Sequence, residues 1–250
     1  MASIKDVAEK AGVTVTTVSR VLNNRGYISA RTRENVQKAM EALDYQPNEL
    51  ARALFRRKSH LIGLVVPDVA HPFFAELTAR IESCAYERGY KLLLCNSFRD
   101  HVKEKAYMEM LRRNQVDGII MAGHSEEISG YLDSRLPIVA IDRFLSDAIP
   151  YVASDNYAGG EMATRHLLAN GCRHLVHISG PLHLNTPANK RCNAFLEVLR
   201  EAGLEGLVVE SGERGFDKEG YEALIRSLLE AHPELDGIFA SSDMIAACVI

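Results

Sequence analysis

From His60 onward, short apolar runs alternate with amphipathic stretches, and this alternation restricts the fold more than any other feature of the sequence. The first four runs are LIGLVV (61–66), YKLLLC (90–95), GIIMA (118–122) and IVAID (138–142). Runs that are apolar throughout are typical of parallel strands buried on both faces, and helical stretches separate the first three of them. The pattern predicts a doubly wound α/β lobe over about 60–155.

After Asp155 the same pattern begins again. The expected strands are HLVHIS (174–179), GLVVE (206–210) and GIFAS (237–241), with helices expected over 157–170, 189–202 and near 217–231. A repeated set of strands and helices indicates a second lobe over about 156–250. We therefore expect a two-lobed α/β core with doubly wound parallel sheets over 60–250.

The first 46 residues lack strand signals and instead read as three short helices. Ser3 followed by Asp6 suggests a capping box for the first helix, and Ala11-Gly12-Val13 marks its end. Thr14 is a plausible N-cap for a second helix over 15–23, and a third helix is expected over about 32–43. Two short helices joined by a tight glycine-containing turn can place the second one in the major groove of DNA. An ordinary helical hairpin is the alternative on shape alone.

Charge separates the two regions. Residues 1–60 carry 11 Lys+Arg against 6 Asp+Glu, a net of +5, whereas the remaining 190 residues carry 18 against 27, a net of −9. A basic head on an acidic body indicates that only the head meets a polyanion. On the second helix the outward residues would be Val15, Thr16, Ser19 and Arg20, and an arginine there suits bidentate contact with guanine.

Several motifs, in one order, closely resemble the lactose-repressor family of bacterial transcription factors. The motifs are VAEKAGVTVTTVSRVLN, Tyr45-Gln46-Pro47-Asn48, VPDVAHPFFAEL, VDGIIM, IVAIDR, SDNYAGG and FASSD, and the resemblance runs from residue 2 to the end of the chain. The resemblance implies a helix-turn-helix head over 1–46, a hinge helix and linker over 47–59, and a core like the periplasmic binding proteins over 60–250.

In that family the hinge becomes helical on DNA, and a leucine from each subunit enters the minor groove, where Leu54 stands here. An apolar wedge suits a kinked base step; a buried residue in a permanent short helix is the alternative. The residues expected at the DNA are Thr14, Val15, Thr16, Thr17, Ser19, Arg20, Asn23, Asn48, Ala51, Arg52 and Leu54.

A second constellation follows strands of the first lobe, at the sheet edge where open α/β sheets bind ligands. Phe73 and Phe74 offer a flat apolar face for a sugar ring, and Asp142 and Arg143 supply an acceptor and planar donors for hydroxyls. Singly, the aromatics could be core and the charged residues a surface ion pair. The set resembles ribose-binding members of the superfamily, which implies these ligand residues: His71, Phe73, Phe74, Asp142, Arg143, Arg191, Phe216 and Ser242.

The sequence departs from the family at two points. Ser242 stands where many sugar-binding members have asparagine, so one amide contact is lost or replaced. The chain ends at Ile250, where the family continues through a closing strand with the last ligand aspartate. For these 250 residues expressed as they stand, we therefore expect an incomplete second lobe that binds sugar weakly or not at all and dimerises poorly, whereas a full-length protein is expected to bind the sugar.

Other function classes find less support. The sequence has no GxGxxG, P-loop or GxSxG motif and no metal-ligand spacing, so we expect no enzyme, cofactor or metal. The five cysteines form no CxxC pair and read as buried, reduced thiols. No apolar run approaches the roughly 18 residues of a membrane-spanning helix, and the N-terminus lacks the apolar stretch of a secretion signal, which favours the cytoplasm and no membrane. A free-standing solute-binding protein would need an export signal.

We therefore predict a transcriptional regulator, most simply a repressor of sugar-utilisation genes. It would bind a pseudo-palindromic operator in double-stranded DNA as a homodimer, under the control of a small, ribose-like sugar held between the lobes. Some family members respond instead to a phosphorylated carrier protein, and that version remains the alternative.

Overall fold

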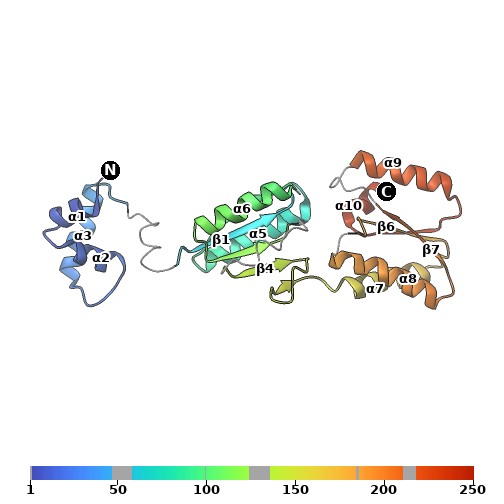
Figure 1. The fold of residues 1–250 in the computed structure, drawn as a ribbon, viewed down its shortest axis with the longest axis horizontal. Helices are drawn as coiled ribbons and strands as arrows, with labels where there is room; N and C mark the ends of the chain where they lie inside the picture. Colours follow the sequence, from blue (N-terminus) through green and yellow to red (C-terminus); the bar gives the residue numbers. More distant parts are fainter. Residues whose placement is uncertain (1, 47–57, 99, 124–135, 184–185, 211–217) are drawn as a thin grey trace. The chain divides into compact units, whose positions relative to one another are not determined.

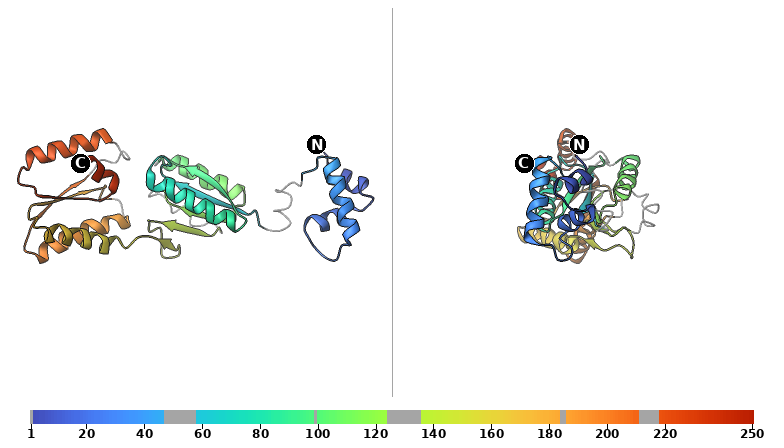
Figure 2. Two further views of the ribbon diagram at one scale, coloured as in Figure 1. Left: turned by 180° about the vertical axis from the view of Figure 1, so that it is seen from behind. Right: turned by 90° about the vertical axis from the view of Figure 1, so that its left-hand side faces the viewer.

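The structure, a computed structural model, forms two compact units, Met1–His60 and Leu61–Ile250 (Figures 1 and 2). The residues that it describes are 2–46, 58–98, 100–123, 136–183, 186–210 and 218–250. The predicted hinge helix, with Asn48, Ala51, Arg52 and Leu54, lies outside the described residues, and so does Phe216.

The head consists of three helices, α1 (Ile4–Lys10), α2 (Val15–Leu22) and α3 (Ala30–Ala42). Its core gathers the apolar positions of all three, namely Val7, Ala8, Val18, Val36 and Ala39. The predicted capping box is present: the amide of Ser3 donates to Asp6 at 2.7 Å, and Ser3 Oγ accepts from the amide of Asp6 at 3.4 Å. Gly12 follows with a φ of 66°, a left-handed conformation that glycine adopts without strain.

The third helix begins two residues earlier than the sequence predicted. Ser29 is its N-cap, with Oγ accepting from the amide of Thr32 at 3.2 Å, so Thr32 lies inside the first turn. A serine three residues before a threonine offers two possible caps, and the backbone uses the first.

The first lobe is a five-stranded parallel sheet in the order β2-β1-β3-β4-β5. The strands are β1 (Leu61–Val66), β2 (Lys91–Asn96), β3 (Gly118–Met121), β4 (Ile138–Ile141) and β5 (Tyr151–Val152). Helices α5 (Pro72–Glu87) and α6 (His101–Arg113) pack on opposite faces, because Phe74 and Ile81 join the Leu64 cluster while Met108 and Leu111 join the Val65 cluster. The first four strands were predicted and β5 was not.

The second lobe has a three-stranded parallel sheet in the order β7-β6-β8. The strands are β6 (Leu175–Ser179), β7 (Gly206–Glu210) and β8 (Gly237–Ala240). The helices are α7 (Asn156–Ala169), α8 (Lys190–Glu201), which follows a 3-10 turn at Pro187–Asn189, α9 (Lys218–Ala231) and α10 (Asp243–Val249).

Helices cover both faces of this second sheet (Figure 1). On one face Phe195 and Leu199 of α8 pack on Leu175, and on the other Ile225 and Ile245 pack on Val176 and its neighbours. The predicted fold class, a helix-turn-helix head with doubly wound α/β lobes, is confirmed.

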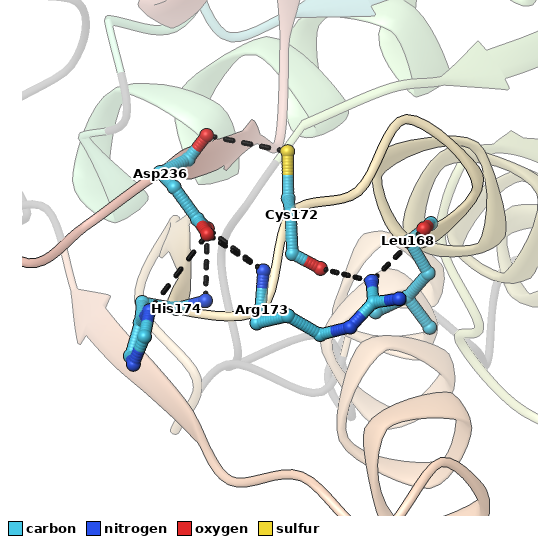
Figure 3. Close-up of polar contacts among 5 residues, drawn as sticks. All are labelled: Leu168, Cys172, Arg173, His174 and Asp236. Carbon is cyan, nitrogen blue, oxygen red and sulfur yellow. Dashed lines mark hydrogen bonds and ion pairs between the residues drawn. The ribbon is translucent and has the colours of Figure 1, made fainter.

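Hydrogen bonds of Asp236 join the segments that directly precede β6 and β8 (Figure 3). The carboxylate of Asp236 accepts the backbone N–H groups of Arg173 and His174, each at 2.8 Å, and the thiol of Cys172 donates to its carbonyl at 3.2 Å. The N–H group of Arg173, more than any other, lowers the pKa of this carboxyl. This contact lies at the sheet edge opposite to the predicted ligand residues.

The cysteines are all free, but only two match the expectation of burial. Cys95 and Cys192 are buried, whereas Cys84 is exposed on α5, where the amphipathic helix turns it away from the sheet. Among the described residues, no helix combines the length and apolar character that a membrane-spanning helix requires.

Candidate functional site

The solvent-facing side of α2 carries several of the predicted DNA-binding side chains. Thr16 and Arg20 are exposed, and Val15 is 40% exposed although it is apolar. Thr14 caps the helix through the amide of Thr17 at 3.2 Å, and the two hydroxyls lie 3.0 Å apart. Because their hydroxyls bond each other, Thr14 and Thr17 define the start of the helix.

Ser19 and Asn23 are half-buried and lie against each other. The side-chain amide of Asn23 donates to the Ser19 carbonyl at 2.9 Å and approaches its hydroxyl at 3.4 Å. The structure thus separates the predicted set into an exposed group, with Val15, Thr16 and Arg20, and a group engaged within α2.

An exposed aromatic that the sequence analysis did not single out lies in the loop between α2 and α3. Tyr27 is 95% exposed and follows exposed Arg25 and Gly26, while the guanidinium of Arg33 donates to Asn24 at 3.1 Å. A tyrosine between arginines in a polar loop was the available signal, because such a side chain has no core to fill.

In the first lobe, Asp142 and Arg143 come directly after β4. Asp142 has a φ of 51°, in the left-handed region that aspartate tolerates better than most residues, and its amide donates to the carbonyl of Val152 at 2.8 Å. Its carboxylate lies 3.5 Å from the side-chain amide of Asn156, the first residue of α7. With its backbone in this left-handed conformation, Asp142 has its carboxylate beside the first residue of α7.

Arg143 is anchored to the loop after β3. Its Nη1 donates to the carbonyl of Gly123 at 2.5 Å, and a Cβ added to Gly123 would lie 2.3 Å from Oε2 of buried Glu104. Glu104, on α6, was not predicted as part of any site. Its carboxylate fills the space that a side chain at position 123 would need, so Gly123 and Glu104 together shape the place where Arg143 binds.

The aromatic pair at the start of α5 is divided between core and surface. Phe74 packs on the Leu64 cluster, with Val66 and Ala122, whereas Phe73 is 50% exposed; the two ring centroids lie 5.0 Å apart. His71 is the N-cap of α5, its Nδ1 accepting from the amide of Phe73 at 3.3 Å, and its ring lies 5.6 Å from Phe74. Phe73 is therefore the more accessible of the two aromatics.

The second lobe repeats this arrangement around another arginine. Arg191, in the first turn of α8, donates from Nη1 to the carbonyl of Ser241, directly after β8. Ser242 is the N-cap of α10, its Oγ accepting from the amide of Ile245 at 3.3 Å. Each lobe thus holds one arginine against a backbone carbonyl just beyond the end of a parallel strand.

A buried histidine of the same lobe was not predicted. His177, on β6, is 0% exposed, and its ring lies 4.5 Å from that of Phe239 and 5.5 Å from that of Phe195. Burial lowers the pKa of His177 to about 4; the bond to the Phe239 carbonyl opposes this, and Arg191 adds to it. The histidine is therefore neutral at physiological pH.

Both arginines lie at the carboxyl edges of parallel sheets, where their guanidinium groups can bind the oxygens of a polar ligand. Within the described parts of the chain, no three His, Cys, Asp or Glu side chains are grouped so that they could hold a metal ion.

A helix-turn-helix head joined to a doubly wound core is the architecture of a DNA-binding regulator with a ligand-binding domain. Residues 3–48 match the family described as bacterial regulatory proteins, lacI family, and residues 59–250 match periplasmic binding proteins and sugar binding domain of LacI family. The chain belongs to the LacI family of bacterial regulators.

Two curated relatives and one solved structure illustrate the similarity. The chain is 43% identical to the ribose operon repressor of Halalkalibacterium halodurans, over 99% of this chain and 73% of that protein. It is also 43% identical to the sucrose operon repressor of Streptococcus mutans, over 98% and 75%. It is 35% identical to a LacI-type regulator of Alkaliphilus metalliredigens complexed with D-xylulofuranose, with a TM-score of 0.66 over 76% of this chain and 70% of that one.

Proposed function

We propose that this chain is a sugar-responsive transcriptional repressor that binds operator DNA as a homodimer through its helix-turn-helix head. The observation that carries the proposal is the pairing, in one chain, of an exposed α2 surface on a basic head with an arginine anchored at the edge of each core sheet. Membership of the LacI family and the relatives named as operon repressors support it.

At the DNA, α2 would lie in the major groove with Thr16 and Arg20 toward the base edges. The two N–H groups of a guanidinium match O6 and N7 of guanine, so Arg20 would read sequence. Exposed Arg25 and Tyr27 would contact the phosphate backbone, which positions the head without reading sequence. The hinge residues Asn48, Ala51, Arg52 and Leu54 would add minor-groove contacts.

We expect Arg20→Ala to weaken operator binding by about 1–3 kcal/mol and to relax sequence preference, because one bidentate base contact is lost. Fluorescence anisotropy against operator and scrambled DNA, at several salt concentrations, measures both effects. Lys38→Ala is the matched control, since it removes one charge from the same head where the lysine is paired with Glu34 at 2.8 Å. Equal specific affinity for the parent and Arg20→Ala would place the recognition surface elsewhere.

In the core, the proposed effector is a small sugar such as ribose. Asp142 would accept hydroxyl hydrogens, Arg143 and Arg191 would donate to hydroxyl oxygens, and Phe73 would cover the apolar face of the ring. His71 and Ser242, both N-caps, would border the site, and Phe216 is proposed as a second aromatic. The sugar would act through different affinities for the two states of the core, which couples it to DNA binding.

Calorimetric titration with pentoses, hexoses and sucrose tests the sugar directly. In a full-length protein we expect heat with a pentose, and a change in operator affinity at the same sugar concentration. Binding of a phosphorylated carrier protein in place of every sugar would instead favour the second type of effector known in the family.

A further inference from the structure

Helices α7 and α8 lie side by side (Figure 1) and approach each other closely at Gly160. A Cβ added to this buried glycine would lie 2.7 Å from the carbonyl oxygen and 2.8 Å from the Cα of Arg191, and 3.0 Å from the Cβ of Ala194. The two nearest atoms belong to backbone, which cannot rotate out of the way as the end of a side chain can. The interface is therefore closed to any residue larger than glycine unless α8 moves.

The neighbouring glycine shows that helix geometry does not explain this requirement. Gly159 lies in the same turn of α7, is exposed, and would have no atom within 4 Å of an added Cβ. Neither glycine has a positive φ. Glycine lowers the stability of a helix interior at both positions, but only at Gly160 does the packing need the missing side chain.

The residue that α7 contacts at Gly160 is Arg191, whose guanidinium extends from α8 to the carboxyl end of β8. Arg191 reaches from the first turn of α8 to the carbonyl of Ser241, so the position of its backbone determines where the guanidinium can bind. Two other contacts join the same pair of helices: Tyr157 donates to Glu197 at 2.6 Å and Arg165 to Glu201 at 2.8 Å. With the helices held there, a side chain at position 160 would displace the first turn of α8.

We infer that Gly160 is a positioning residue of the sugar site. Because it has no side chain, the backbone of Arg191 can pack directly against α7, and this packing fixes the position of the guanidinium that binds the sugar. The inference rests on the proposed function of Arg191. A displacement of several tenths of an ångström is enough to spoil hydrogen bonds, whose strength falls steeply with distance and angle.

The test compares Gly160→Ala with Gly159→Ala in the full chain, by calorimetric titration with D-ribose, D-xylulose and sucrose. We expect Gly160→Ala to weaken the sugar that binds by about tenfold or more, and Gly159→Ala to leave its affinity unchanged. Operator affinity without sugar should be the same in both, because the head is a separate compact unit. If both variants bound sugar as the parent does, the inference would be overturned.

Two further measurements separate positioning from a general loss of stability. In an Arg191→Lys background, Gly160→Ala should cost much less sugar affinity, because an effect that acts through the guanidinium disappears with it. Equal losses in both backgrounds would show a merely structural role.

The side-chain Nε–H resonance of Arg191, assigned by its absence in Arg191→Lys, reports its position without any ligand. We expect it to move in Gly160→Ala and not in Gly159→Ala, and an unmoved resonance would contradict the inference. Absence of heat with every sugar in the parent protein would refute the proposed effector alone, since this resonance would still decide the role of Gly160.

Discussion

Replacement of Arg143 by alanine is expected to remove the response to sugar while leaving operator binding intact. A hydrogen bond from a charged donor to a ligand is worth about 1.5–3 kcal/mol, so the loss of two such bonds should weaken sugar binding at least about 100-fold. The head is a compact unit of its own, so operator affinity without sugar should equal that of the parent. Calorimetry and anisotropy on the same preparation measure the two affinities.

Two control variants sharpen this result. Arg143→Lys keeps the charge but loses the planar fork, and we expect sugar affinity between those of the parent and the alanine variant. Arg113→Ala removes an exposed arginine of the same lobe, paired with Glu109 at 3.5 Å, and should change nothing. A sugar response preserved in Arg143→Ala would move the site away from the end of β4. A simultaneous loss of operator affinity would mean that the bond to Gly123 supports the whole lobe.

The parallel strands could be predicted because strands buried on both faces of a sheet consist of continuous apolar runs. Strand β5 could not be predicted from the sequence because it has only two residues, Tyr151 and Val152, and both are exposed. Nothing in its composition separates such a strand from a loop. It is paired with β4 through Ala140 and Ile141, and this contact exists only once the sheet has formed.

The candidate site divides in the same way. Asp142 and Arg143 could be picked out because charged residues directly after a buried strand are conspicuous, and Arg191 could be picked out from its spacing in the family. The groups that hold these side chains in place could not be predicted, because they depend on contacts between residues far apart in the chain. The carbonyl of Ser241 meets Arg191 across 50 positions, and Phe239 meets His177 across 62.

Glycines and buried polar residues are especially hard to interpret from sequence. Gly123 and Gly160 look like many loop or helix glycines until the atoms that occupy the space beside them are known. His177 stands in an apolar run, where a single histidine gives no sign of whether its ring is buried. In this lobe it is buried completely, and this has a measurable consequence for stability.

We expect the second lobe to lose about 3 kcal/mol of stability between pH 6.5 and pH 4 through His177 alone. The pKa of this histidine is about 4 in the folded protein, against 6.5 for the free side chain. Below pH 6.5 His177 is therefore protonated in the unfolded chain but stays neutral in the folded lobe. The free energy of unfolding consequently falls as the pH is lowered. The change is about 1.4 kcal/mol per pH unit, or about 2 kcal/mol at pH 5, and it fades above about pH 7.5, where both states are neutral.

The physical cause is the surroundings of the ring. Nδ1 lies 2.9 Å from the Phe239 carbonyl, whereas Nε2 is buried with no hydrogen-bond partner among the described residues. A proton on Nε2 would place a charge beside two phenyl rings in a fully buried position, and the charge of Arg191 would oppose it.

Hydrogen exchange of the β6 amides, followed from pH 7 to pH 5, reports this lobe separately from the head. His177→Phe removes the titrating group and keeps an aromatic ring between Phe195 and Phe239, so the difference between parent and variant isolates the histidine from carboxyls such as Asp236, which also titrate. His166→Ala, which removes an exposed histidine of α7, is the matched control. A His177→Phe variant with the same pH slope as the parent would show that the folded lobe accepts the proton, and that the ring is not held neutral by its burial.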